Sequence, residues 1–155
     1  MRLGIISDTH GLLRAEVHEV FREVDRILHA GDVGDASILD ELALIAPVTA
    51  VYGNTDGSML RSRLPEVARE SIDDMRFVLT HGDRLGSPDP DALKAAFPDA
   101  DVIVYGHTHR QLVSHAEGRL VVNPGAAGAR RFNLEPSVGR LTLEGDRVSV
   151  EIVEL

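Results

Sequence analysis

Two histidines stand one residue apart in the stretch Gly106-His107-Thr108-His109, directly after the apolar run Val102-Ile103-Val104-Tyr105. That run predicts a buried strand, which the glycine ends. Ligands of open α/β sheets bind outside the carboxyl ends of the strands, so the two imidazoles lie where chemistry is usually found. A His-x-His pair alone more often lies in solvent at a strand edge and has no function. The question is whether other strand ends bring ligands to the same place.

Four other predicted strand exits carry side chains of the same kinds. The combined set comprises two carboxylates, one carboxamide and four imidazoles: Asp8, His10, Asp32, Asn54, His81, His107 and His109. Turns use Asp and Asn readily, but they do not need His. Five exits with such side chains therefore indicate one shared site.

Mixed nitrogen and oxygen ligands without thiolate suit Mn²⁺, Fe²⁺ or Zn²⁺ and disfavour Ca²⁺. Seven protein ligands are too many for one tetrahedral ion, and they suit two ions about 3.5–4 Å apart. We expect two divalent metal ions, with Mn²⁺ preferred and Fe, Zn or Ni as alternatives. A hydroxide held between the ions would be the nucleophile, because metal binding lowers the pKa of water.

The elements that must position these residues alternate in the first third of the chain. Strands are predicted at 2–7, 25–30 and 47–52, with helices at 15–24 and 37–46 between them, the second capped by Ser37. This alternation favours an α/β fold wound with crossover helices. After a polar loop at 58–65, the predicted elements are a hairpin at 67–72 and 75–80, a helix at 91–97, a strand at 101–105, and hairpins at 111–116 with 119–123 and 138–143 with 148–155.

Composition sets the outer bounds. The 155 residues show no repeat or linker, which predicts one domain, 1–155, that buries about two thirds of its unfolded surface. The chain has no cysteine, so disulfides, thiolate metal sites and cysteine nucleophiles are excluded. A net charge of −9 and an aromatic content of 4% disfavour a nucleic-acid surface. No apolar run suits a signal peptide or a membrane span, so the expected location is the cytoplasm.

Several other polar residues have simpler interpretations. Turn or helix-capping roles are expected for Asp35, Asp56 and Asp83. Surface or core roles without chemistry are expected for His18, His29 and His115. An exposed loop is expected to carry Arg61 and Arg63. Asn123 could orient a ligand histidine, although the slightly favoured role is to shape its Asn-Pro turn. Arg130 and Arg131 follow a glycine-rich loop and could bind the phosphate of a substrate, although a solvated role fits them equally well.

The order Asp8-x-His10, Gly31-Asp32, Gly53-Asn54, His81 and Gly106-His107-x-His109 resembles the calcineurin-like metallophosphoesterase superfamily, in particular its compact bacterial and archaeal phosphodiesterase branch. The resemblance implies a four-layer α/β/β/α sandwich of two mixed sheets flanked by helices. It also implies catalytic roles for Asp32, Asn54 and His107. One metal would bind Asp8, His10 and His109, the other would bind Asn54, His81 and His107, and Asp32 would bridge them.

One departure from the family pattern concerns the leaving group. Many members have a histidine, thought to protonate the leaving group, where this chain has Thr55. A threonine cannot act as a general acid near neutral pH, and general acid catalysis contributes about 10²–10⁴ in rate. The compact branch commonly lacks this histidine. We therefore expect hydrolysis of a small phosphodiester with an acidic leaving group, and weak phosphomonoesterase activity.

Two other functions stay open at this stage. A phosphomonoesterase or nucleotide hydrolase on the same fold is disfavoured by the missing histidine. A non-catalytic scaffold for binding is disfavoured because such scaffolds typically lose metal ligands, and all seven are present here. The sequence does not identify the physiological substrate or the oligomeric state.

Overall fold

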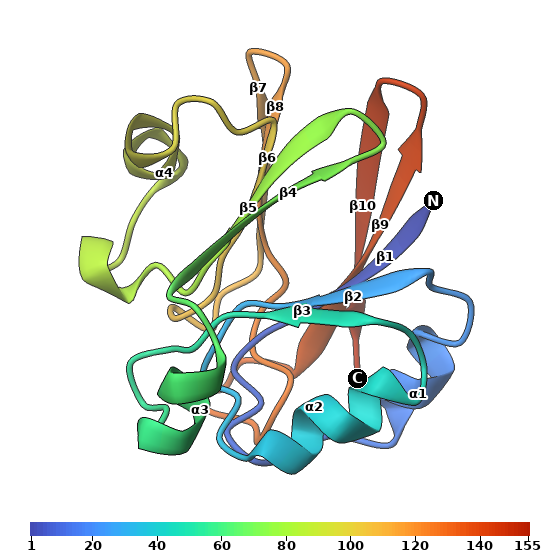
Figure 1. Ribbon diagram of the computed structural model, residues 1–155, viewed down its shortest axis with the longest axis vertical. Helices are drawn as coiled ribbons and strands as arrows, with labels where there is room; N and C mark the ends of the chain where they lie inside the picture. The colour runs from blue at the N-terminus through green and yellow to red at the C-terminus, as the bar shows by residue number, and fades with distance from the viewer.

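Two five-stranded sheets pack face to face, with helices on their outer sides, in the computed structural model, which describes residues 1–155 (Figure 1). Sheet A has the spatial order β10 (Arg147–Glu154), β9 (Ser137–Glu144), β1 (Arg2–Ile6), β2 (Arg26–His29) and β3 (Val48–Ala50). Sheet B has the order β4 (Val67–Ile72), β5 (Met75–Thr80), β6 (Val102–Val104), β8 (Arg119–Asn123) and β7 (Leu112–Ala116).

Both sheets are mixed. In sheet A, β1, β2 and β3 run parallel, and β9 joins β1 in the antiparallel direction. In sheet B, β5, β6 and β8 run parallel between the antiparallel edge strands β4 and β7. The carboxyl ends of the parallel strands in each sheet therefore lie together, which is where sequence reasoning expects ligands.

The helices form the outer layers. They are α1 (Glu16–Val20), α2 (Ala36–Ala43), α3 (Ser58–Arg63), the 3₁₀ turn η1 (Asp83–Leu85) and α4 (Pro90–Ala96). Buried residues of α1, α2 and α3 pack against sheet A, and Leu93 of α4 packs against sheet B. The predicted four-layer sandwich is confirmed (Figure 1). No helix combines the length and the apolar composition that a bilayer crossing requires.

Strand alternation explains how one short strand serves two cores. Val102 and Val104 of β6 point into the apolar layer between the sheets, whereas Ile103 packs beneath α4. Leu3 of β1 likewise faces the other sheet, and Ile6 faces the helices. Because both faces of these strands are covered, the strands read as continuous apolar runs in the sequence.

Helix α3 corrects the loop predicted at 58–65. Its only buried residue is Leu60, so the segment has no apolar stripe that a pattern search could detect. The helix is instead tied to the preceding loop, because Arg61 donates from Nε to the Asp56 carbonyl at 2.7 Å and from Nη2 to the Asn54 carbonyl at 3.1 Å. Side-chain hydrogen bonds to that loop and one buried leucine, not an apolar stripe, therefore hold the helix in place.

The ends of two other helices also differ from prediction. The cap of α2 is Asp35, whose carboxylate accepts from the Ser37 N–H at 2.9 Å, so the predicted capping by Ser37 is wrong and the role expected for Asp35 is confirmed. The first helix ends at Val20, because residues 21–25 are needed to reach β2. The Asp25 N–H already bonds to the Arg2 carbonyl at 2.7 Å.

Two leucines at the end of α2 provide a matched test of the packing against sheet A. Leu42 is fully buried, whereas Leu44 is 85% exposed. We expect Leu42→Ala to lower the free energy of unfolding by about 3 kcal/mol, because it leaves a cavity. Leu44→Ala should change it by less than about 0.5 kcal/mol. Urea denaturation measures both, and equal losses would contradict the packing described here.

Candidate metal centre

Seven polar side chains from both sheets gather at one end of the sandwich. Asp8 and His10 follow β1, Asp32 follows β2, Asn54 follows β3, His81 follows β5, and His107 and His109 follow β6. Four of them are buried, namely Asp8, Asp32, His81 and His109, while His10 and His107 are half-buried and Asn54 is exposed. The cluster therefore opens to solvent on one side. The structure brings together all seven residues that the sequence predicts as ligands.

A first group of ligand atoms comes from β1 and β6. Nε2 of His109 lies 3.3 Å from Oδ1 of Asp8, and Nε2 of His10 lies 3.6 Å from the same oxygen. The two Nε2 atoms are 3.3 Å apart. A carboxylate oxygen and two imidazole nitrogens this close form a candidate site for one cation.

A second group shares Asp8 and adds residues from β2 and β5. Nε2 of His81 lies 3.2 Å from Oδ2 of Asp32 and 3.8 Å from Oδ1 of Asp8. Oδ2 of Asp32 also lies 3.7 Å from Nε2 of His10, in the first group. Two carboxylate oxygens therefore each face histidines of both groups.

Asn54 and His107 complete the cluster on its exposed side. Nδ1 of His107 lies 3.1 Å from Oδ1 of Asn54. The ring of His107 meets that of His81 edge to face, with centroids 5.2 Å apart. An amide oxygen and an imidazole thus extend the second group toward solvent.

Neighbouring backbone and side-chain groups fix how these ligands point. Oδ2 of Asp8 accepts from the Ser7 hydroxyl at 2.6 Å and from the His107 N–H at 3.1 Å, so its other oxygen is left to face the cluster. Nδ1 of His81 donates to the Ala30 carbonyl at 2.8 Å, which directs Nε2 inward. The Thr55 N–H likewise occupies one oxygen of Asp32 at 2.9 Å.

Three buried side-chain atoms have no hydrogen-bond partner: Oδ1 of Asp8, Nε2 of His81 and Nδ1 of His109. An unpaired polar atom in the interior is costly. The first two face the same space, 3.8 Å apart. A divalent cation between them would satisfy both, so the residues present fit a metal site.

The ligand positions also show an unusual backbone. Five of the seven residues adopt positive φ, with values of 54° at Asp8, 48° at His10, 53° at Asp32, 72° at His107 and 63° at His109. Residues other than glycine rarely adopt this conformation, and each instance costs on the order of 1 kcal/mol or more. The fold holds these ligands in positions that a relaxed chain would avoid.

Two glycines are required because ligand side chains approach the backbone closely. A Cβ at Gly53 would lie 2.1 Å from Oδ1 of Asp32, and one at Gly106 would lie 2.0 Å from Oγ of Ser7. Any larger residue at either position would displace a carboxylate of the cluster or its hydrogen-bond donor. This explains the glycine before Asn54 and before His107.

Burial and neighbouring charges shift the pKa values of His81 and Asp8 in opposite directions. Burial disfavours the charged form of His81, yet its contacts with Asp32 and the charge of Asp8 raise the pKa of His81 to about 9. Burial alone would raise the pKa of Asp8, but the nearby imidazoles of His10 and His109 hold that pKa well below its usual range. Attraction between these groups therefore offsets the cost of burying them.

Asp56 has a larger role than the turn former expected from sequence. Its buried carboxylate accepts three backbone N–H groups, from Val33 at 3.2 Å, Gly34 at 2.9 Å and Gly53 at 2.9 Å. It thereby joins the loop that carries Asp32 to the loop that carries Asn54. A single Asp after a strand gives no sequence signal for this role.

His29 is a fully buried core residue, as expected. Its Nδ1 accepts from the Gly31 N–H at 3.2 Å, so Nε2 carries the hydrogen and donates to the Thr9 hydroxyl at 3.0 Å. That hydroxyl donates to the Val33 carbonyl at 2.8 Å. Burial lowers the pKa of His29 to about 4, so the ring is neutral near pH 7.

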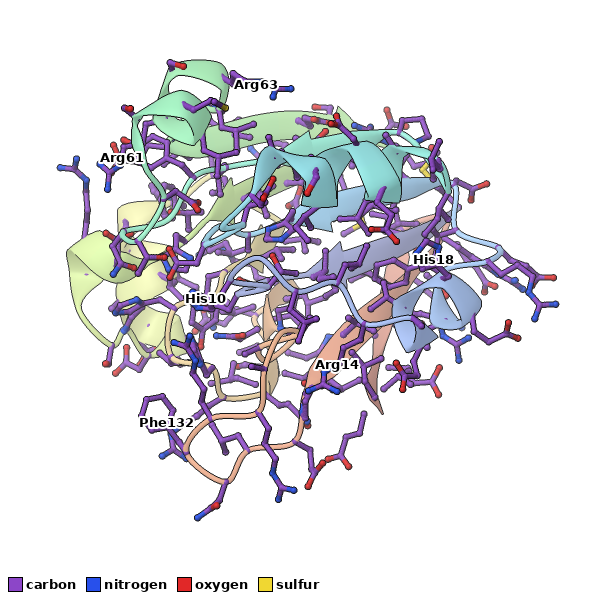
Figure 2. All side chains as sticks on the ribbon, turned by 90° about the horizontal axis from the view of Figure 1, so that it is seen from below. His10, Arg14, His18, Arg61, Arg63 and Phe132 are labelled. Atoms are coloured by element: carbon purple, nitrogen blue, oxygen red, sulfur yellow. The ribbon has the colours of Figure 1, made fainter.

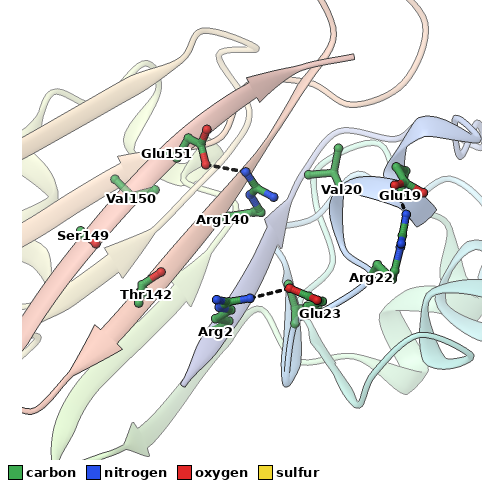
Figure 3. A pocket seen from close by; sticks show the side chains of 11 residues that line it. Arg2, Glu19, Val20, Arg22, Glu23, Arg140, Thr142, Ser149, Val150 and Glu151 are labelled. Atoms are coloured by element: carbon green, nitrogen blue, oxygen red, sulfur yellow. Dashed lines mark hydrogen bonds and ion pairs between the residues drawn. The ribbon is translucent and has the colours of Figure 1, made fainter.

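The two arginines considered as candidate phosphate ligands lie outside this network. Arg130 pairs with Glu135 at 2.9 Å, and neither Arg130 nor Arg131 makes a hydrogen bond or ion pair with the seven cluster residues. A separate groove of about 590 Å³ lies beside α1, β9 and β10 (Figure 3). Its charges neutralise one another, as in the pairs Arg2–Glu23 at 2.7 Å and Arg140–Glu151 at 2.6 Å.

The buried neutral state of His29 makes stability depend on pH. Between pH 6.5 and about 4 the unfolded chain binds a proton that folded His29 refuses, so stability is lost as the pH falls through this window. The contribution of this group is on the order of 3 kcal/mol. Urea denaturation of the wild type and of His29→Asn measures it. The variant should show a flatter pH dependence, and parallel curves would refute this account.

Comparison with known proteins gives a consistent family. The calcineurin-like phosphoesterase superfamily domain matches residues 1–146. A probable metallophosphoesterase from Methanothermobacter thermautotrophicus is 37% identical over 164 aligned residues, which cover 99% of this chain and 92% of the relative. A phosphodiesterase from Methanocaldococcus jannaschii is 32% identical, with 93% and 94% covered.

Solved structures agree. An archaeal phosphodiesterase superposes with a TM-score of 0.80 at 27% identity, covering 99% of this chain and 100% of the other. Vacuolar Protein Sorting 29 from Cryptosporidium parvum gives a TM-score of 0.83 at 24% identity, with 99% and 97% covered, and this likeness concerns the fold alone. The expected membership is confirmed: this chain belongs to the calcineurin-like phosphoesterase superfamily.

Proposed function

We propose that residues 1–155 form one catalytic domain, a phosphodiesterase that uses two divalent metal ions held by the seven-residue cluster. One observation carries the proposal. Oδ1 of Asp8 and Oδ2 of Asp32 each lie within 4 Å of histidines from both ligand groups. Anionic oxygens between two sets of imidazoles suit a pair of cations better than a single ion.

The ligand chemistry favours Mn²⁺, with Fe, Zn or Ni as alternatives, because the cluster offers carboxylate, amide and imidazole but no thiolate. We assign one ion to Asp8, His10 and His109, and the other to Asn54, His81 and His107. Asp32 is the bridging ligand in this assignment. Its position between His10 at 3.7 Å and His81 at 3.2 Å supports that role.

The residues around the open side of the cluster position the substrate phosphate in this proposal. Bound divalent ions supply positive charge for the phosphate and bring the pKa of water toward neutrality. Asn54 and His107 lie on the open side of the cluster, so we assign them, with Asp32, to the catalytic machinery that receives the phosphate. We keep Arg130 and Arg131 as candidate phosphate ligands, and Arg130 would have to leave Glu135 for this.

Thr55 determines which leaving groups the site can expel. Its backbone N–H holds Asp32, and its side chain offers no group that could protonate a departing alkoxide near neutral pH. Leaving groups that depart as stable anions should therefore be favoured. The preference for diesters is supported by the relative from Methanocaldococcus jannaschii that is described as a phosphodiesterase.

A pair of substrates with one leaving group tests the function. Bis(4-nitrophenyl) phosphate and 4-nitrophenyl phosphate both release 4-nitrophenolate, so they differ only in the ester class. We expect Mn²⁺-loaded protein to hydrolyse the diester with at least about tenfold higher kcat/KM, and because the leaving group is shared, this difference reports the ester class and not protonation of the leaving group. Chelation should abolish the activity, and added Mn²⁺ should restore it. A preference for the monoester would refute the proposal, as would activity that survives chelation.

Metal stoichiometry tests the dinuclear assignment separately from activity. Calorimetry should find two Mn²⁺ ions per wild-type chain. His109→Ala removes a ligand of one ion and should leave about one, whereas Asp32→Asn removes the bridging charge and should weaken both. The matched control His115→Ala changes an exposed histidine on β7 and should keep two. Two ions bound by Asp32→Asn, in a variant that melts like the wild type, would contradict the bridge.

A further inference from the structure

Phe132 is a large apolar side chain that lies in solvent beside the candidate metal centre. It is 76% exposed, and its ring centroid lies 5.9 Å from that of His109 with the rings tilted by 59°. Figure 2 shows Phe132 on a loop at the same end of the molecule as His10. An exposed aromatic ring gives up the stabilisation that burial would bring, and this ring does so directly beside a candidate metal ligand.

The backbone at this position is also unfavourable for an aromatic residue. Phe132 and Asn133 have φ values of 55° and 59° in a two-residue turn closed by the Leu134 N–H donating to the Arg131 carbonyl at 2.9 Å. Turns with positive φ at both central positions favour Asn and Gly, and a bulky residue there is an outlier. Glycine or asparagine would be less strained than phenylalanine at this position.

The loop that carries Phe132 is tied to the ligand cluster at its base. The Gly128 N–H donates to the Asp8 carbonyl at 3.2 Å, and Nε of Arg14 donates to the Gly128 carbonyl at 2.9 Å. Arg130 and Glu135 pair across the loop at 2.9 Å. The ring is therefore presented at a defined place relative to Asp8 and His109.

We propose that Phe132 is a specificity-determining residue, an aromatic wall that receives a flat aromatic substituent of the substrate while the phosphate lies at the metal centre. This inference rests on the proposed function and names its substrate class: phosphate esters that carry an aryl ring or a nucleobase. One side of the Phe132 ring contacts His109, and the rest of its surface is free to stack. Aromatic stacking of this kind is tolerant of the ring's identity.

The alternative is that Phe132 only packs against His109 and fixes the orientation of that imidazole. The two roles predict different results. A packing role affects the binding of Mn²⁺ and, through it, every phosphate ligand equally. A stacking role affects only ligands that carry a ring.

Binding of phosphate monoesters to Mn²⁺-loaded protein separates these roles without measuring catalysis. The ligands are methyl phosphate, phenyl phosphate and thymidine 5′-monophosphate, which share the phosphate and differ in the attached group. The proteins are the wild type, Phe132→Ala, Phe132→Leu and the control Leu44→Ala, which removes an exposed apolar side chain at the end of α2. Calorimetry gives the affinity for each ligand and for Mn²⁺.

We expect Phe132→Ala to weaken binding of at least one ring-bearing ligand about fivefold, as removal of one stacked aromatic pair should. Phenyl phosphate and the nucleotide distinguish an aryl from a nucleobase partner. Phe132→Leu should lose most of the same affinity, because it keeps an apolar side chain but not the flat ring. Methyl phosphate and Mn²⁺ should bind all four proteins equally.

Equal affinity of the wild type for methyl and ring-bearing ligands would overturn the inference. So would a uniform loss for all three ligands, or weaker Mn²⁺ binding by Phe132→Ala. Diester hydrolysis with these results would leave the proposed function standing. Ring-selective binding without hydrolysis would instead refute the function and keep the role of Phe132.

Discussion

The two oxygens of the Asp8 carboxylate make different contacts, and the arrangement of the other cluster residues depends on this difference. One oxygen is held by the Ser7 hydroxyl and the His107 N–H, and the other has no hydrogen-bond partner and faces three histidines. Because the backbone of His107 helps to hold Asp8, the exits of β1 and β6 are locked together across the two sheets. Buried charge is tolerated there because opposite charge and oriented donors surround it.

Sequence reasoning predicted which residues meet in the cluster because it combined residue type with position. Histidine is not needed in turns, so its repeated occurrence after apolar runs was informative, and the family pattern supplied the roles that remain proposals. The strand positions were also predictable, since short apolar runs bounded by Gly and polar residues read clearly. The pairing of β1 with β9 was not predictable. Most of the chain separates these two strands in the sequence, and neither strand contains a local pattern that identifies its partner.

The features that sequence reasoning missed depend on tertiary structure or on backbone conformation. Helix α3 has one buried leucine and is held by Arg61, so its pattern looks like a polar loop. Phe132 looks like an ordinary apolar residue until its exposure and its positive φ are known. The positive φ values of five cluster residues could not be predicted either. The amino-acid sequence does not show which residues the fold forces into the left-handed region.

The three N–H groups bound by Asp56 have a mechanical consequence. Val33 and Gly34 belong to the exit of β2, and Gly53 belongs to the exit of β3. These hydrogen bonds hold the two loops together, so the loops move as one unit. The spacing between Asp32 and Asn54 is therefore set by a carboxylate outside the cluster. Asp56, which is not one of the candidate metal ligands, therefore controls the dimensions of the candidate metal centre.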